Sequence, residues 1–340
     1  MKWVLFLCTM IVGMLGVLFR LIMQAAEEKP GSSAVDPKPS EPVATNPNPA
    51  EPVNTAPLVS MFIISDSHVN PDLPDYNERL RMAFEDMSQF ENVQAVILTG
   101  DVTDYGRDRD YKLFRTMTDA YKLPPFYANM GNHDYYDIWL DKAGQFSTAT
   151  MPNGKTDKMS RDRFTSFFGL QKPYHEVWIG SVHVILLSQE TYQQENPEVG
   201  EGAWYSDEQL AFLSKALESH KDGSPVLVMI HQPLPEQGKD GGTHRVIPAI
   251  KFREILKPYP NVFVFSGHQH RELSPQSYTK ETFHHFNNAS VTRVRSTRGS
   301  LSQGLFVQVY ENQISIRGRD FSKKQWMDDV ADWTVPFQKV

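Results

Sequence analysis

Short apolar runs that end abruptly at polar residues recur in the first half of the chain. These runs cover residues 58–64, 95–99 and 126–128. Their length and composition indicate buried strands. The stretches between them, residues 76–90 and 110–121, have the periodicity of helices. Because strands and helices alternate, the pattern predicts an α/β fold built on a partly parallel sheet.

The second half of the chain has a different pattern, with more strands and fewer helices. The predicted elements are a hairpin of residues 174–179 and 182–187, a helix at 206–220, buried strands at 226–230 and 262–265, and a second hairpin of 305–310 and 313–317. No change of composition divides this part of the chain. Residues 58–340 are therefore predicted to form one domain.

The N-terminal residues have the composition of a targeting segment followed by a spacer. Lys2 precedes the apolar stretch 3–19, so residues 1–26 are expected to be a signal peptide or an uncleaved membrane anchor, and both alternatives stay open. Residues 27–57 are rich in Pro, Ala, Asn and Glu and have few large apolar side chains. Such a segment is expected to be a disordered linker. The domain that follows is expected to be extracytoplasmic, either secreted or anchored.

Charge and cysteine content limit the chemistry that the chain can carry. The formal net charge is −7, which disfavours a polymeric nucleic-acid partner. The only cysteine, Cys8, lies in the N-terminal apolar stretch. A metal site in the predicted domain must therefore use His, Asp, Glu or Asn, which suit cations such as Zn, Fe and Mn.

Each predicted buried strand is followed by a cluster of polar side chains that could bind metal. Asp66 and His68 are separated by one residue, and so are His268 and His270, so each pair can project to the same side. Glycine precedes several of the other clusters, where the backbone must turn sharply. Because ligands bind at the carboxyl ends of strands in such sheets, we expect the clusters to converge on one site.

Taken together, the clusters resemble the motifs of the calcineurin-like metallophosphoesterase family, which are D-x-H, G-D-x-x-D, G-N-H-[DE], a strand-terminal H and G-H-x-H. In this chain they read Asp66-Ser67-His68, Gly100-Asp101-Val102-Thr103-Asp104, Gly131-Asn132-His133-Asp134, His231 and Gly267-His268-Gln269-His270. The resemblance implies a catalytic domain at 58–340 with two packed mixed β-sheets flanked by helices. The motifs look most similar to those of bacterial cyclic-nucleotide-phosphodiesterase-like members.

The resemblance also implies a role for each motif residue. One metal ion is expected to be held by Asp66, His68 and His270, the other by Asn132, His231 and His268, with Asp101 bridging both. The ions are expected to be Mn, Fe or Zn. Two such ions lower the pKa of a shared water and neutralise phosphoryl oxygens, so a bridging hydroxide can attack the phosphorus. His133 is the implied catalytic histidine, Asp104 its partner, and Asp134 a residue of the local turn.

Departures from relatives narrow the expected activity. Purple acid phosphatases have tyrosine in place of Asp104, and protein Ser/Thr phosphatases have Arg-Gly in place of Tyr105-Gly106, which disfavours both activities. The expected function is hydrolysis of a small phosphomonoester or phosphodiester. The substrate alternatives are a cyclic nucleotide, a nucleotide, or a lipid or cell-wall phosphate. A non-catalytic binding or scaffold protein on the same fold is the alternative from another class, and a membrane partner is expected only if residues 1–26 are retained.

Two segments between the motifs have open interpretations. His244 lies in a glycine-rich loop, where it could reach a substrate or simply belong to the surface. Residues 135–163 follow the candidate catalytic histidine, and we expect either a lid over the site or a plain surface insertion.

Overall fold

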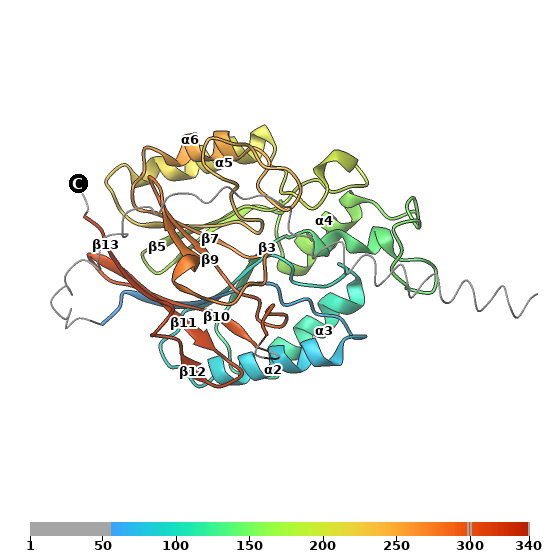
Figure 1. The fold of residues 1–340 in the computed structure, drawn as a ribbon, viewed down its shortest axis with the longest axis horizontal. Coiled ribbons are helices and arrows are strands. Elements are labelled where there is room, and N and C mark those ends of the chain that lie inside the picture. The colour runs from blue at the N-terminus through green and yellow to red at the C-terminus, as the bar shows by residue number, and fades with distance from the viewer. Residues whose placement is uncertain (1–55, 298, 300, 339–340) are drawn as a thin grey trace, which may run out of the picture. The chain divides into compact units, whose positions relative to one another are not determined.

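The structure, a computed structural model, describes residues 56–297, 299 and 301–338. In this part of the chain two β-sheets pack face to face, and helices cover their outer faces (Figure 1). Helix α2 (Pro74–Met87) lies outside the first sheet. Helices α5 (Asp207–Leu217) and α6 (Ala249–Leu256) lie outside the second sheet. This arrangement confirms the α/β fold with two packed mixed sheets.

The first sheet has seven strands, and the first strand of the domain lies in its interior. The strands are β1 (Val59–Ile64), β2 (Ala95–Thr99), β3 (Phe126–Asn129), β10 (Gln303–Val309), β11 (Gln313–Asp320), β12 (Gln325–Trp326) and β13 (Asp332–Pro336). Their order is β12-β11-β10-β1-β2-β3, and β13 also pairs with β11. Strands β1, β2 and β3 are parallel, so their carboxyl ends lie at the same end of the sheet.

The second sheet has six strands and a parallel centre. The strands are β4 (His175–Ile179), β5 (Val182–Leu186), β6 (Val226–Met229), β7 (Val262–Ser266), β8 (Tyr278–Lys280) and β9 (His284–Asn287), in the order β4-β5-β6-β7-β9-β8. Strands β5, β6, β7 and β9 run parallel, and the outer strands β4 and β8 are antiparallel to their neighbours. The sheet is therefore mixed.

Alternation along the buried strands explains why both faces of each sheet are apolar. In β1, Met61 and Ile63 point into the core between the two sheets, whereas Phe62 and Ile64 point into the core beneath α2. Strand β6 alternates in the same way, with Leu227 facing the first sheet and its neighbours facing α5 and α6. A strand that is covered on both faces has a continuous run of apolar residues, and the sequences of β1 from Met61 onward and of β6 are such runs.

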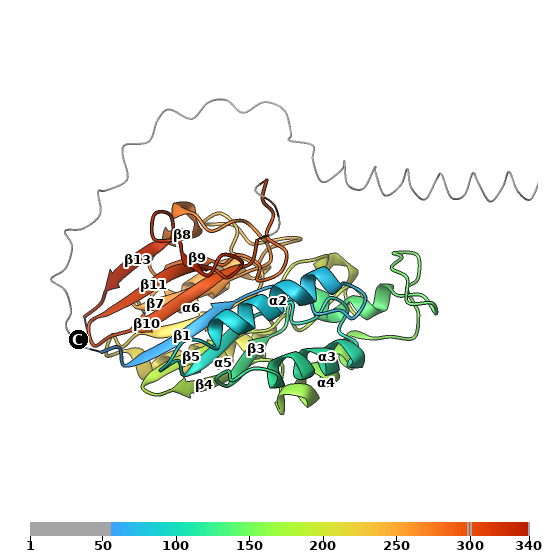
Figure 2. The same cartoon turned by 90° about the horizontal axis from the view of Figure 1, so that it is seen from below.

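The remaining helices connect the strands, and two of them pack with α2 in the core on the outer face of the first sheet (Figure 2). They are α3 (Asp108–Asp119), α4 (Asp157–Phe168) and the short 3₁₀ helices η1 (His133–Trp139), η2 (Pro197–Val199), η3 (Glu218–His220) and η4 (Pro275–Ser277). Local capping fixes several of their ends. The Thr156 side chain accepts a hydrogen bond from the Met159 amide at the start of α4, and Gly169 ends that helix with φ of 69°.

Residues 135–163, for which the sequence left a lid or a plain surface insertion open, combine helical ends with a mostly exposed irregular stretch at 141–156. This segment contains most of η1 and the first half of α4. The Arg163 guanidinium pairs with Asp137 at 2.5 Å, which joins α4 to η1, and it donates to the carbonyl oxygen of Gly106 at 2.6 Å. The helical ends of the segment are therefore fixed to each other and to the loop of Gly106, and the two alternatives for the stretch between them stay predictions.

The predicted buried strands and both hairpins are present, but several short elements were not predicted. Strands β8, β9, β12 and β13 and helix α6 are among them. Strand β9 has the sequence His-His-Phe-Asn, which lacks an apolar run, yet His284 and His285 are buried beside β7. Its position in the sheet comes from pairing with distant residues, which local sequence does not encode.

The predictions for the N-terminus fall mainly outside the part of the chain that the structure describes. This applies to the expected signal peptide or anchor at residues 1–26 and to all but the last two residues of the expected linker at 27–57. Within residues 56–338 as described, none of the helices has the length and apolar character needed to cross a membrane.

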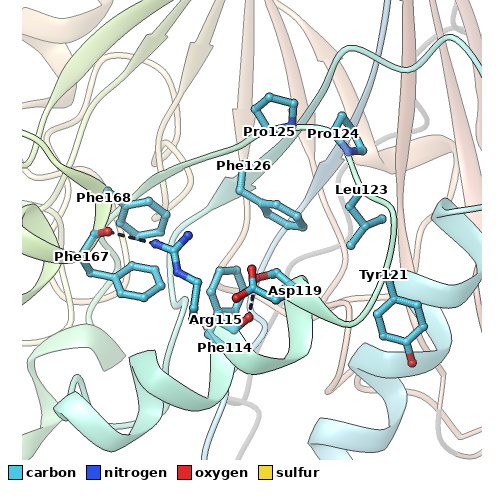
Figure 3. Close-up of a pocket in the computed structure, with 11 residues that line it drawn as sticks. Phe114, Arg115, Asp119, Tyr121, Leu123, Pro124, Pro125, Phe126, Phe167 and Phe168 are labelled. Atoms are coloured by element: carbon cyan, nitrogen blue, oxygen red, sulfur yellow. Dashed lines mark hydrogen bonds between the residues drawn. The ribbon is translucent and has the colours of Figure 1, made fainter.

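A cavity of about 730 Å³ opens between α3, the residues leading into β3 and the end of α4 (Figure 3). Phe114, Phe126 and Phe167 line it. The guanidinium carbon of Arg115 lies 4.6 Å from the ring centroid of Phe167. No residue of the polar clusters contributes to the lining, so this cavity is separate from the candidate chemistry.

A buried ion pair fastens α2 to β11. Both guanidinium contacts of Arg319 to the Asp86 carboxylate are 2.8 Å long, and the two residues are 7% and 2% exposed. The aromatic rings of Phe90 and Trp326 lie 5.3 and 4.8 Å from the guanidinium carbon. Because the cation is enclosed, its charge depends on Asp86 for compensation.

We therefore expect Asp86→Ala to lower the free energy of unfolding by about 3–5 kcal/mol, because it leaves a buried charge without its partner. Urea denaturation followed by circular dichroism measures this change. Glu85→Ala is the matched control, since Glu85 is exposed on the same helix and should change stability by less than about 0.5 kcal/mol. Equal stability of the two variants would contradict the expectation.

Candidate metal centre

The polar clusters lie in loops that follow five strands, three in the first sheet and two in the second. Asp66 and His68 follow β1, Asp101 and Asp104 follow β2, Asn132 and His133 follow β3, His231 follows β6, and His268 and His270 follow β7. Since the strands of each group are parallel, their carboxyl ends lie together. The face-to-face packing of the sheets then brings the two groups of loops into contact.

The backbone of these loops is held in a rarely populated conformation. Positive φ angles occur at Asp66 (57°), His68 (41°), Asp101 (49°), His268 (67°) and His270 (54°). Residues with a side chain seldom adopt this region, and it persists only where the surrounding contacts enforce it. Such strain gathers at functional sites, and here it aims side chains from neighbouring loops at one place.

Two glycines allow the loops to approach each other. A Cβ atom at Gly131 would lie 2.2 Å from Oδ1 of Asp101, and one at Gly267 would lie 2.6 Å from Oδ2 of Asp66. No side chain fits at such distances. The glycines that precede Asn132 and His268 in the motifs are therefore required by close packing around the carboxylates.

One group of side chains surrounds a point between β1 and β7. Nε2 of His270 lies 2.9 Å from Oδ1 of Asp66 and 3.1 Å from Nε2 of His68. Nε2 of His68 lies 3.7 Å from Oδ2 of Asp101. All four residues are buried and offer one ligand atom each within a small sphere. Two imidazole nitrogens and two carboxylates facing one point form a donor set for a divalent cation.

A second group shares Asp101 with the first. Nε2 of His231 lies 3.1 Å from Oδ2 of Asp101, and the two residues cluster with His268. Oδ1 of Asn132 lies 3.0 Å from Nδ1 of His268. Nδ1 of His231 lies 2.7 Å from the carbonyl oxygen of Thr99, which fixes the tautomer that presents Nε2 to the cluster. Asp101 thus stands between two sets of ligand atoms.

Several atoms of these groups are better placed to bind a metal ion than to form hydrogen bonds with each other. Oδ2 of Asp101 and Nε2 of His231 are buried and close but poorly aligned, so neither completes a hydrogen bond. Burial lowers the pKa of His68 to about 4, which leaves its imidazole neutral and able to bind a cation. Burial also lowers the pKa of His231, but the negative charges of Asp101 and Asp66 outweigh this effect. They raise the pKa of His231 to about 9. A cation at this point would take the place of that proton.

His133 and Asp104 lie beside the two groups, as the motifs implied. Nδ1 of His133 is 3.2 Å from Oδ1 of Asp104, and Asp104 also faces Nδ1 of His68 at 3.2 Å. Burial lowers the pKa of His133, but Asp101 and Asp104 raise it to about 8. The side chain of His133 is 17% exposed, so a substrate can reach it. Tyr136 stacks on its ring with 3.9 Å between centroids.

Two neighbours of the site had open interpretations in the sequence. Asp134 accepts hydrogen bonds from the backbone amides of Gly131 and Thr103, at 3.1 and 3.0 Å, so it holds the local turn. His244 is exposed, and its Nδ1 lies 3.0 Å from Nε2 of His268. The loop that carries His244 therefore borders the candidate metal centre.

Glu201 is a residue of the site that sequence reasoning missed. Its Oε2 accepts hydrogen bonds from the Asn132 side-chain amide at 2.7 Å and from the Tyr136 hydroxyl at 2.9 Å. Its Oε1 accepts from Tyr192 at 2.6 Å. With its amide nitrogen held by Glu201, Asn132 turns its oxygen toward His268 and the second group. The available signal was a glutamate between two glycines in the loop before α5.

The comparison with family models identifies the class of protein to which this fold and site belong. The model described as calcineurin-like phosphoesterase matches residues 60–272, which is more than half of the chain. The chain belongs to the calcineurin-like phosphoesterase family. The family and the buried Asp and His clusters together support a dinuclear metal site and metal-dependent phosphoester hydrolysis. A search of curated proteins finds no match.

Solved structures with a similar fold include phosphoesterases of distant sequence. Purple acid phosphatase PPD1 from yellow lupin (Lupinus luteus) seeds is 13% identical, with a TM-score of 0.55 over 82% of this chain and 53% of that one. This chain thus spans about half the length of the lupin protein. A conserved uncharacterised protein of Streptococcus pneumoniae, a predicted phosphoesterase, is 11% identical, with a TM-score of 0.36. The match covers 82% of this chain and 97% of that one. The likeness to the lupin protein concerns the fold alone.

If Glu201 positions Asn132, replacing the carboxylate by an amide should weaken the second metal position. We expect Glu201→Gln to lower the affinity for Mn²⁺ by about 10–100-fold, as is typical when the partner of a ligand is lost. Calorimetric titration of the metal-free protein with MnCl₂ measures this affinity. Glu198→Gln, an exposed neighbour in η2, should leave the affinity unchanged. Identical titrations of the two variants would show that Glu201 does not act on the metal position.

Proposed function

We propose that this protein hydrolyses a small phosphomonoester or phosphodiester with two metal ions bound at the candidate centre. The observation that carries the proposal is the position of Asp101 between two groups of buried ligand atoms contributed by five loops. All seven side chains that the family motifs imply as ligands are present, and the other six lie around the Asp101 carboxylate. A scaffold protein that had lost catalysis would have no need of the full donor set.

When bound, two cations supply Lewis-acid activation of water and neutralise charge on the phosphoryl oxygens. Asp66, His68 and His270 would hold one ion, and Asn132, His231 and His268 the other, with Asp101 contacting both. The protein supplies the remaining chemistry through His133. Its Nδ1 faces Asp104, so Nε2 is the nitrogen that can donate a proton to the leaving oxygen.

Charge and composition favour a small substrate outside the cytoplasm. The chain has a net charge of −7, which would repel the backbone of a nucleic-acid polymer. The apolar stretch after Lys2 and the Pro-rich residues that follow support export, with the domain either secreted or tethered to a membrane. A cyclic nucleotide, a nucleotide, or a lipid or cell-wall phosphate fits these constraints.

Hydrolysis of chromogenic substrates tests the proposal directly. We expect the purified full-length chain, supplied with Mn²⁺, Fe²⁺ or Zn²⁺, to release nitrophenolate from p-nitrophenyl phosphate, bis-p-nitrophenyl phosphate or both. Chelation by EDTA should abolish the activity, and metal should restore it. Failure to cleave either ester with each of the three metals would refute the enzyme proposal and favour the scaffold alternative.

Two alanine variants separate metal binding from proton transfer. We expect His133→Ala to lower kcat by about 10²–10⁴-fold, the usual contribution of a general acid, while bound metal stays at the wild-type level. Asn132→Ala should lower both kcat and metal content, because it removes a ligand of the second ion. Analysis of the metal content of dialysed samples, run beside the kinetic assay, distinguishes the two variants. Metal loss in His133→Ala, or full activity in either variant, would contradict the assigned roles.

A further inference from the structure

Three loops near the candidate metal centre carry arginines, and two of these loops also carry ligands. The three loops follow β6, β7 and β9. We call this group of side chains the arginine rim, and it consists of Arg245, Arg271, Arg293 and Arg295. These residues have no place in the family motifs or in the chemistry described above.

Arg245 is held directly against the residues that carry metal ligands. Its Nη1 donates to the carbonyl oxygen of His244 at 2.9 Å, and the His244 ring contacts His268. With its amide oxygen turned toward the guanidinium, Gln269 accepts from both terminal nitrogens of Arg245 at 3.1 Å. Gln269 stands between His268 and His270, so the guanidinium lies beside the second coordination group.

Arg271 and Arg295 lie next to each other across a short bridge between two loops. Their backbones form an isolated parallel β-bridge, and the Arg295 amide donates to the carbonyl oxygen of His270 at 2.7 Å. Both side chains are exposed. Burial lowers the pKa of Arg245, and the positive charge of Arg271 adds to that effect.

Arg293 lies in the loop after β9, which contacts the loop of Asp66. Its amide donates to Oγ of Ser290 at 2.7 Å, and the same hydroxyl donates to the carbonyl oxygen of Asp66 at 2.9 Å. The guanidinium carbon of Arg293 lies 6.0 Å from the ring centroid of Tyr76, which belongs to α2.

Within the described residues, most arginines outside the rim have a carboxylate partner, whereas Arg79 and Arg115 donate to backbone carbonyl oxygens. Arg163 pairs with Asp137, Arg253 with Glu281, and Arg319 with Asp86. Among the residues that the structure describes, none of the rim arginines forms an ion pair with Asp or Glu. Acidic residues outnumber basic ones in this chain, 41 to 34, so partners are not scarce. Gathering like charges without counter-ions costs free energy unless an anion binds there.

We propose that the arginine rim binds a second phosphate group of the substrate, beside the phosphoryl group that the metal centre holds. The proposal deepens the proposed function, on which it rests, by naming the substrate class: a small phosphoester that carries another phosphate. Guanidinium groups suit this role because their planar donors match phosphate oxygens in pairs. A substrate with one phosphate would bind at the metal centre and leave the arginine rim without a bound phosphate.

Binding of phosphonates, whose carbon–phosphorus bonds are not hydrolysed, tests the rim without requiring catalysis. Calorimetry compares propylphosphonate with propane-1,3-diphosphonate on the Mn²⁺-loaded full-length chain. The diphosphonate should bind on the order of tenfold more tightly, which exceeds the about twofold statistical advantage of two equivalent groups. Arg245→Gln and Arg271→Gln should each reduce this preference by at least about threefold, with little change for propylphosphonate.

Arg81→Gln is the matched control, because it removes the same positive charge as the rim variants. Arg81 is exposed on α2 and pairs with Glu78. The preference of this variant for the diphosphonate should equal that of the wild type. A wild-type preference no greater than the statistical factor, or equal preferences in all three variants, would overturn the proposal. Absence of p-nitrophenyl ester hydrolysis would instead refute the proposed function, and the calorimetric result would still report on the rim.

Discussion

The shared position of the Asp101 carboxylate is the constraint on which the rest of the site depends. It lies within 3.7 Å of His68 on one side and 3.1 Å of His231 on the other, and those histidines come from different sheets. A buried carboxylate without a full set of hydrogen bonds is costly. The surrounding imidazoles lower its pKa in spite of burial, so it stays ionised and can attract cations.

Packing of the two sheets gives this carboxylate its neighbours. The inner core contains Met61 and Ile63 from β1 and Leu227 and Met229 from β6, and it fixes how far apart the carboxyl ends of these strands lie. A change in that distance would separate the two groups of loops. Backbone strain such as that at the ligands persists only where the surrounding structure enforces it, and close-packed interiors resist small displacements.

Charge is arranged in two zones around the centre. Carboxylates and imidazoles lie buried at the middle, and the arginine rim lies at the edge, where Arg245 contacts the loop of His268. Glu201 belongs to neither zone, since its carboxylate accepts from two side-chain amides and two tyrosine hydroxyls. This division separates the groups that attract cations from those that attract an anion, although the chain as a whole is acidic.

The sequence by itself determined the buried strands and the ligand candidates at their ends, because an apolar run that stops at Asp66 or Asp101 is a local signal. It also identified His133 and Asp104 through the motifs. Only the tertiary structure decided that Glu201 holds Asn132 and that four arginines gather beside the centre. Those contacts join loops that are distant along the chain, and their partners are chosen by how the sheets pack, which no local pattern of residues records.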